Sequence, residues 1–415
     1  MRPPSSKSLP TPETLSASLY PARIAVVTSH PVQYQAPLFQ YLTAHGFDLT
    51  VYYAHDDSLV GAIDPEFGVP VTWDRPLMDG YRSVVLTSKR SAAGKTSAMF
   101  ARMRLVRDLA RRSYDAVFIH SYATSFSLAG YVGAWLSSAP VLLRTESEMI
   151  RPRHSSVQLA KDLLLRWLFR HTGAFLAIGK ANVEFYRHYG VPADRLFMTP
   201  YCVDNDFFDR RRTELEPHRA QIKASFAFQA DIPVIVFVGK FIERKRPMDL
   251  LEAYAAVLRG GTRVGLLLVG DGELRGEMER FIAAHHLHDV KITGFRNQTE
   301  LPECYVIGDV FVLPARFDTW GLVLNEAMLF GLPVVVSDGV GARLDLVEPD
   351  VTGYVYAVGD VNALAAHLQS LIESPELRTR MGRSARERVH RYDYAACARG
   401  LADALQTAMS LAQAT

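Results

Sequence analysis

The sequence has few cysteines, little net charge and no long apolar run. Its three cysteines, Cys202, Cys304 and Cys397, lie far apart without metal-binding spacing or pairing, which is typical of a protein in a reducing cytosol. No apolar run approaches the roughly 18 residues that a membrane-spanning helix needs. The formal net charge of +2 gives no indication of nucleic acid as a partner. Residues 1–21 lack the apolar core of a signal peptide, and we predict a disordered tail there.

Apolar residues, by contrast, are plentiful enough for packed cores, at 48% of 415 residues. Such a length favours two domains. Strand-like runs alternate with helix-like segments, as in doubly wound α/β sheets. We expect a first domain over residues 22–205, a second over 206–391, and a C-terminal helix over 392–415 that crosses back to the first. Strands of the first domain are expected at Arg23–Thr28, Asp48–Ala54, Ser83–Leu86, Ala116–His120, Val141–Arg144 and Ala174–Ile178.

The most informative stretch runs from Val312 to Asp338. Two apolar, strand-like runs bracket a helix that we expect between Gly321 and Gly331. The unpaired backbone amides around Thr319 to Leu322 lie at the positive end of the helix dipole. This stretch therefore predicts a seat for a phosphate group.

Two carboxylates belong to the same stretch. Asp318 lies just before the helix and Glu326 lies inside it, with seven residues between them. Both side chains are suited to accept hydrogen bonds from sugar hydroxyls. The alternative is structural: Asp318 caps the helix, as Asp commonly does, and Glu326 is an ordinary solvated helix residue.

A pair of lysines follows the strand that we expect at Pro233–Val238. Gly239 permits close approach of the backbone to a ligand, and Lys240 and Lys245 can reach one point beyond the strand end. Two ammonium groups at that point would neutralise a diphosphate. The alternative interpretation is two ordinary surface lysines.

Two other motifs are weaker. Gly270, Gly272 and Gly276 follow a strand-like run, but an additional residue breaks the G-x-G-x-x-G spacing of a dinucleotide site. Asp204–Asp206 reads D-N-D, a word that occurs in metal-binding D-x-D sites. It falls in an expected linker here, so we interpret it as structural and predict no metal.

Polar residues follow the strands of the first domain, where ligands gather in an open α/β sheet. They are His30, Gln33, Tyr34 and Gln35 after the first strand, His120 at the end of its strand, and Arg144, Thr145 and Glu146 after the next. The alternatives are a polar turn, a structural histidine and a local ion pair.

The central stretch resembles the E-x7-E signature of the retaining glycosyltransferases of family four, which have the GT-B architecture. The matching residues are Trp320, Gly321, Leu322, Glu326, Ala327, Gly331, Pro333 and Val334. The first acid of the signature is Asp318 here instead of Glu, which shifts the carboxylate by one methylene. The G-D-G word at Gly270–Gly272 is also usual in the family. The I-T-G-F word ending at Phe295 resembles the place where the nucleotide base sits in the family, and the alternative is that Phe295 belongs to the core. The resemblance extends over nearly everything from Arg23 onward.

The resemblance implies two Rossmann-like domains that face each other across a cleft. It implies transfer of a sugar, with retention, from a nucleotide-sugar donor to a glycan or lipid-linked acceptor. In that reading Lys240 and Lys245 hold the diphosphate, Glu326 the ribose, and Asp318 and His120 the donor sugar. The predicted donor-binding residues are Gly239, Phe295, Thr319, Trp320, Gly321, Leu322 and Glu326, the acceptor-side residues are His30, Gln33, Tyr34 and Glu146, and no metal or cofactor is expected.

Two basic stretches, residues 89–112 and 151–171, raise the question of a membrane partner. The second reads as an amphipathic basic helix with Trp and Phe, which can lie on an anionic membrane surface. The alternative is a packing helix with a solvated basic rim. We expect a cytoplasmic protein, with contact to the inner face of the plasma membrane as a hypothesis. Two other function classes stay open: a GT-B sugar-nucleotide epimerase or hydrolase, and a non-catalytic sugar-nucleotide binder.

Overall fold

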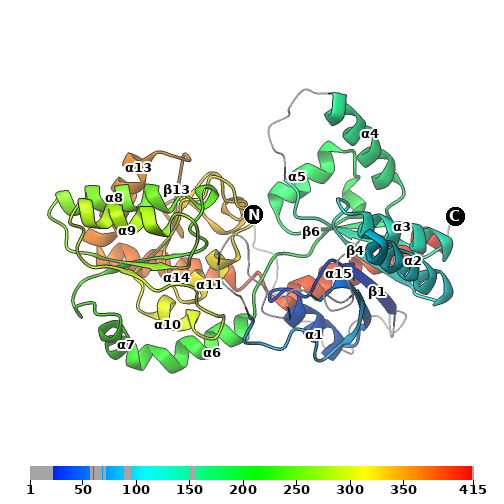
Figure 1. Cartoon of the computed structure of the whole chain (residues 1–415), viewed down its shortest axis with the longest axis horizontal. Coiled ribbons are helices and arrows are strands. Elements are labelled where there is room, and N and C mark those ends of the chain that lie inside the picture. Colours follow the sequence, from blue (N-terminus) through cyan, green and yellow to red (C-terminus); the bar gives the residue numbers. More distant parts are fainter. Residues whose placement is uncertain are drawn as a thin grey trace, which may run out of the picture.

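The computed structural model describes residues 22–56, 59, 68, 72–87, 95–148 and 156–413. The predicted tail, residues 89–94 of the first basic stretch and residues 151–155 of the second lie outside the described residues. The chain forms two α/β domains, each built on one parallel sheet, as predicted (Figure 1). Residues of both domains line a cavity between them.

The first domain is built on a parallel seven-stranded sheet of order β3-β2-β1-β4-β5-β6-β7. Its strands are β1 (Arg23–Thr28), β2 (Asp48–His55), β3 (Arg82–Thr87), β4 (Ala116–His120), β5 (Val141–Arg144), β6 (Ala174–Ala177) and β7 (Leu196–Met198). Its helices are α1 (Ala36–Ala44), α2 (Lys95–Arg111), α3 (Ser125–Leu136), α4 (Ser156–Arg170) and α5 (Lys180–His188). Helices cover both faces of this sheet, which is why its central strands are apolar on both sides.

The second domain has a parallel six-stranded sheet of order β10-β9-β8-β11-β12-β13. Its strands are β8 (Val234–Val238), β9 (Gly265–Val269), β10 (Val290–Ile292), β11 (Val310–Leu313), β12 (Val334–Ser337) and β13 (Gly353–Tyr356). Its helices are α6 (Asn205–Leu215), α7 (Arg219–Ser225), α8 (Pro247–Arg259), α9 (Arg275–Ala284), α10 (Leu301–Val306), α11 (Leu322–Leu329), α12 (Arg343–Leu346), α13 (Val361–Glu373) and α14 (Pro375–Val389). One continuous apolar core joins this sheet to its helices.

The chain crosses between the domains twice. The last helix, α15 (Tyr394–Gln413), packs against β6 and β7 of the first domain (Figure 1). Near this crossing one sequence interpretation was wrong. Asp204–Asp206 does not lie in a linker, because Asp204 caps α6 by accepting a hydrogen bond from the Phe207 amide at 3.0 Å. Cys202 and Cys397, which are far apart in the sequence, meet in the fold, where their buried, free thiols lie 3.5 Å from each other.

Candidate active site between the two domains

A cavity of about 530 Å³ lies between the domains, where β8, β9 and β11 end. The carboxyl ends of parallel strands are where ligands bind in open α/β sheets. Of the residues predicted for the site, these line the cavity: Gln33, Tyr34, Glu146, Gly239, Lys240, Lys245, Phe295, Asp318, Thr319, Trp320, Gly321, Leu322 and Glu326. Folding therefore brings together residues that lie about three hundred positions apart, while their individual roles stay predictions.

Lys245 and Asp318 form an ion pair in the wall of this cavity. Each side chain is only 14% exposed, so water screens their attraction less than at the surface. Backbone hydrogen bonds hold Asp318 in place, since its amide donates to Gly339 O at 3.0 Å and its carbonyl accepts from the Gly341 amide at 2.8 Å. A Cβ on Gly341 would lie 2.0 Å from the carbonyl oxygen of Thr319. Glycine is therefore needed for this loop to reach Asp318.

Gly321 sets the direction in which α11 begins. Its φ of 87° is in the left-handed region, which glycine adopts without strain. A Cβ there would also lie 2.8 Å from the Leu313 side chain. The helix starts at Leu322, and Gly321, Leu322 and Val323 line the cavity. This geometry is suited to an anionic group.

Glu326 is buried, with 7% of its surface exposed, so its interpretation as a solvated helix residue was wrong. Burial raises the pKa of its carboxyl to about 7, and the hydrogen bond from Tyr305 opposes that rise. The Tyr305 hydroxyl donates to Oε2 at 2.7 Å. Tyr305 thus fixes one carboxylate oxygen, and the residue still lines the cavity.

Two of the residues predicted for the acceptor side, Tyr34 and Glu146, contact each other, and Tyr201 joins them. The hydroxyls of Tyr34 and Tyr201 both donate to Glu146 Oε1, the first at 3.2 Å. Tyr34 and Tyr201 also contact each other edge to face, with ring centroids 5.6 Å apart. His30 lies apart from this network, because its ring stacks on His55 and its Nδ1 hydrogen-bonds Ser29 at 2.9 Å.

Known proteins share both halves of this arrangement. Residues 31–202 match the family described as "Glycosyl transferase 4-like domain", and residues 218–388 match "Glycosyl transferases group 1". The chain belongs to the group 1 glycosyltransferases of the family-four type.

Individual relatives of this glycosyltransferase are distant. It is 27% identical over 295 residues to the alpha-D-kanosaminyltransferase of Streptomyces kanamyceticus, covering 68% of this chain and 74% of that one. It is 26% identical over 402 residues to the sulfoquinovosyl transferase SQD2 of Arabidopsis thaliana, covering 94% and 72%. The crystal structure of Anabaena Alr3699/HepE in complex with UDP and glucose has a TM-score of 0.69 at 17% identity, covering 93% and 99%. That likeness shows the GT-B fold.

His120, like His30, lies apart from the other residues predicted for the site of the glycosyltransferase. It does not line the cavity described above. Gln35 Nε2 lies 3.3 Å from its Nδ1, and its ring stacks on Phe118. Its Nε2 is inaccessible and has no hydrogen-bond partner among the described residues. Burial, with the charge of Arg144, lowers the pKa of His120 well below its usual value, so the ring is neutral. Its contact with a donor sugar stays a prediction.

Sequence reasoning missed several residues of the glycosyltransferase cavity region, among them Trp73, Gln298 and Glu148. Trp73 and Gln298 line the cavity itself. Glu148 lies in a narrow adjoining space with Thr319 and Trp320, and burial raises the pKa of its carboxyl to about 7, with the charge of Asp318 adding to the rise. None of the three sits in a motif, so only a pattern of contacts reveals them.

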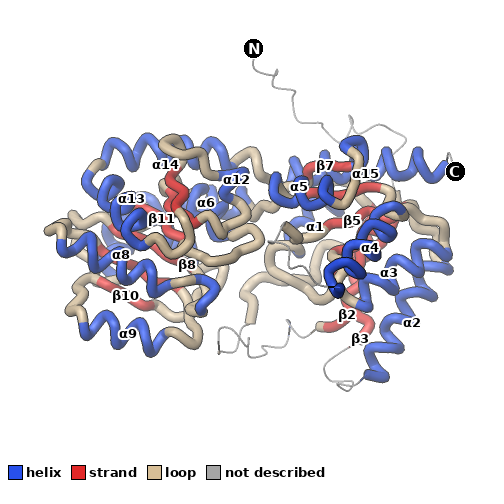
Figure 2. Tube along the Cα trace, turned by 90° about the horizontal axis from the view of Figure 1, so that it is seen from above, coloured by secondary structure: helices blue, strands red, loops and turns tan. Residues whose placement is uncertain are grey.

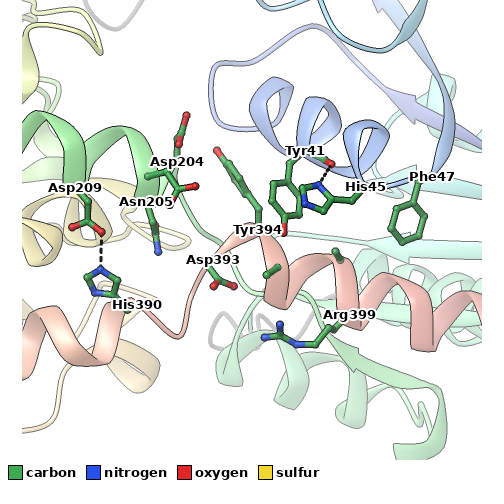
Figure 3. Close-up of a pocket in the computed structure, with 13 residues that line it drawn as sticks. Tyr41, His45, Phe47, Asp204, Asn205, Asp209, His390, Asp393, Tyr394 and Arg399 are labelled. Carbon is green, nitrogen blue, oxygen red and sulfur yellow. Dashed lines mark hydrogen bonds and ion pairs between the residues drawn. The ribbon is translucent and has the colours of Figure 1, made fainter. Parts of the chain in front are cut away.

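A second cavity, of about 340 Å³, lies at the crossing between the domains (Figure 3). Asp204, Asn205 and Asp209 come from the start of α6, whereas Tyr41 and His45 come from α1 of the other domain. Asp209 already accepts hydrogen bonds from His390 at 2.8 Å and Arg386 at 2.7 Å. Among the described residues no cluster of His, Cys, Asp or Glu is placed to hold a metal ion.

Proposed function

We propose that this glycosyltransferase transfers a sugar with retention from a nucleotide-sugar donor to a glycan or lipid-linked acceptor, without a metal ion. The observation that carries the proposal is that Lys240, Lys245 and the first residues of α11 all line the same cavity. Positive charge and backbone donors placed in advance stabilise the negative charge that develops on a leaving diphosphate. The UDP complex of the structural relative supports a nucleotide donor.

In the proposed mechanism the ion pair of Lys245 and Asp318 opens when the donor binds, and each residue then contacts the donor. When a diphosphate arrives, Lys245 turns from Asp318 to the phosphate oxygens. Asp318 is then left to accept a hydrogen bond from a hydroxyl of the donor sugar. The bond between the anomeric carbon and the diphosphate oxygen breaks, and the acceptor oxygen bonds to that carbon on the same face. The acceptor proton passes to the departing phosphate oxygen, so the step needs no protein base.

Substitution of Lys245 tests this proposal. Lys245→Ala should lower sugar transfer by orders of magnitude with the fold intact, whereas Lys245→Arg, which keeps the charge, should retain much of it. Release of nucleotide from a panel of nucleotide sugars, with and without acceptors, measures the rate. Near-normal turnover by Lys245→Ala would remove Lys245 from the mechanism. Product formed without any acceptor would favour a hydrolase or epimerase, and donor binding without turnover would favour a non-catalytic binder.

Exposed apolar side chains gather on three helices of the first domain, which favours an acceptor that lies in a membrane. Of 15 exposed large apolar side chains in the described residues, 10 lie on α2, α3 and α4. They are Met99, Phe100, Met103, Leu128, Val132, Trp135, Leu136, Leu163, Leu164 and Trp167. Helices α2 and α3 lie side by side in Figures 1 and 2, and α4 meets α3 through a contact between two tryptophan rings. The ring centroids of Trp135 and Trp167 are 5.4 Å apart, and Arg102 donates to Ser125 at 2.9 Å. No described helix is long and apolar enough to cross a membrane.

We propose that this face, formed by α2, α3 and α4, docks on the anionic surface of a cytoplasmic membrane. Arginines stand among the apolar side chains, and in the described part of α2 only Asp108 opposes them, already within 4 Å of Arg104 and Arg107. Pairing with a second copy would place these arginines against each other, whereas anionic headgroups complement them. Aromatic and aliphatic side chains then enter the headgroup boundary.

Sedimentation with lipid vesicles tests this docking. The protein should bind vesicles that contain phosphatidylglycerol, bind pure phosphatidylcholine much less, and dissociate at high salt because screening weakens the attraction. The double variant Phe100→Ala, Trp167→Ala should lose most of the binding. Leu344→Ala, an exposed apolar residue of the other domain, is the control. The proposal would be overturned if the double variant bound vesicles as well as the wild type does. It would also be overturned if the wild type formed dimers without lipid and the double variant did not.

A further inference from the structure

A short segment of the first domain reaches across the cleft onto the second. This strap comprises residues 72–75. The carbonyl of Thr72 accepts a hydrogen bond from Asn297 Nδ2 at 3.1 Å. The carboxylate of Asp74 accepts hydrogen bonds from both the amide, at 3.0 Å, and the hydroxyl of Thr299. These contacts join two segments more than 200 positions apart in the chain.

The next residue of the strap ties it to the crossing between the domains. Arg75 pairs with Asp204 at 2.9 Å, and its guanidinium lies over the Phe207 ring at 4.8 Å from the centroid. The strap is therefore held at both ends, which fixes the position of the tryptophan between them.

Trp73 is the strap residue that enters the cavity. It lines the cavity together with Phe295, and the two rings contact each other edge to face with centroids 6.2 Å apart. Phe295 comes from the segment after β10, and Trp73 comes from the opposite domain. One end of the cavity is thus aromatic on both sides of the cleft.

Gln298 adds an amide group beside this aromatic end, and its oxygen is unpaired among the described residues. It lines the cavity, is only 6% exposed, and its Oε1 has no hydrogen-bond partner among the described residues. A buried polar atom without a partner is uncommon in native proteins. Because the amide group offers both an acceptor and donors, it suits the edge of a planar heterocycle.

The order of the strands places the aromatic end apart from the cationic one. Phe295 follows β10 and Lys240 follows β8, with β9 between them. At about 4.8 Å per strand, the two ends lie roughly 10 Å apart along the sheet edge. A nucleoside diphosphate has the same polarity, with a flat base at one end, two phosphates at the other and a ribose between.

We propose that Trp73 and Gln298 complete the nucleobase site, Trp73 as a stacking wall from the first domain and Gln298 as the hydrogen-bonding group for the base edge. The proposal rests on the proposed function, since it assumes a nucleotide in this cavity. Trp73 contacts Phe295 directly, so the Trp73 side chain turns from Phe295 onto the base when a base enters, while the strap stays in place. The acceptor-side domain thereby takes part in selecting the donor.

Binding of free nucleotides tests the base site without relying on turnover. Titration calorimetry with UDP, ADP, GDP and CDP gives the affinity of each and the ratio between the tightest and the weakest. Trp73→Ala should weaken the preferred nucleotide about tenfold, because stacking on an aromatic side chain contributes that much per base. Gln298→Leu should reduce the ratio between bases. Neither variant should change the affinity for inorganic pyrophosphate, which carries no base.

Trp135→Ala, which makes the same substitution on α3, is the matched control and should bind nucleotides like the wild type. If the wild-type protein binds none of the four nucleotides, the proposed function fails. If it binds one of them and Trp73→Ala and Gln298→Leu leave affinity and base ratio unchanged, the base-site proposal fails while the proposed function stands. Equal weakening of pyrophosphate by Trp73→Ala would show a general effect on the cavity and would also overturn the base site.

Discussion

The ammonium group of Lys245 is paired with the carboxylate of Asp318 in the wall of the cavity between the domains. Lys245 ends a short 3₁₀ turn after β8, whereas Asp318 follows β11, the neighbouring strand. The pair joins two loops at the site where we place the diphosphate. Asp318 therefore competes with the diphosphate for Lys245, and Lys245 competes with the sugar hydroxyl for Asp318. Substitution of either residue should affect both nucleotide binding and turnover.

Asp318→Asn should separate these two roles. Without the carboxylate charge, Lys245 is free to meet a diphosphate, so affinity for the preferred nucleoside diphosphate should rise several-fold. Sugar transfer should fall by at least tenfold, because the acceptor for a sugar hydroxyl is weakened. Calorimetry and nucleotide release measure the two effects. Weaker nucleotide binding by Asp318→Asn would show that the ion pair organises the site instead of competing with the ligand.

Gly321→Ala should destabilise the protein and lower its activity. Its left-handed φ costs an alanine about 1–2 kcal/mol, and the new methyl group would meet the Leu313 side chain at 2.8 Å. Thermal unfolding measures the first effect and sugar transfer the second. Gly276→Ala is the control, since Gly276 lies in α9 and a Cβ there finds its nearest neighbour at 3.6 Å. That variant should be as stable as the wild type or more so, and an equal loss at both positions would contradict this account of Gly321.

The raised pKa of Glu326 predicts a pH dependence of stability. Burial raises that pKa from 4.5 to about 7, so between these values the folded state holds a proton that the unfolded state has released. The stabilising effect of the neutral form is complete below pH 4.5, decreases as the pH rises through this window, and is absent above about pH 7. The total for a shift of this size is up to about 3 kcal/mol.

Glu326→Gln should remove most of that decrease. Its amide stays neutral at every pH, so the free energy of unfolding should fall less between pH 5 and pH 7 than in the wild type. Urea unfolding at several pH values gives the slope. Glu184→Gln on the exposed side of α5 is the control. An unchanged slope in Glu326→Gln would assign the dependence to other groups, such as Glu148.

Trp320→Phe should weaken the hydrogen bonds that connect α11 to Tyr201, in the segment where the chain first passes from one domain to the other. The indole Nε1 donates to Asn325 Oδ1 at 2.8 Å, and Asn325 Nδ2 donates to Tyr201 O at 3.3 Å. Phenylalanine keeps an aromatic ring but leaves the fully buried Asn325 without a donor, at a cost of about 1–3 kcal/mol. Thermal unfolding should show the loss, and the double variant Trp320→Phe, Asn325→Leu should recover part of it. No recovery would indicate that packing of the indole matters more than its hydrogen bond.

The strands and the central motif could be predicted from local pattern. Arg23–Thr28 and Val141–Arg144 have the predicted bounds, because a buried parallel strand is a short apolar run with clear ends. The α6 helix was missed, because its polar sequence after D-N-D resembles a linker.

By itself, the sequence determined the family, the two parallel sheets and the loops at which ligands gather, because these depend on periodicity and on motifs of adjacent residues. Only the tertiary structure decided that Lys245 pairs with Asp318, that Glu326 is buried against Tyr305, and that Trp73 faces Phe295 across the cleft. The physical reason is that such contacts join residues brought together by the packing of different strands and domains, and no local pattern in the chain records which of them meet.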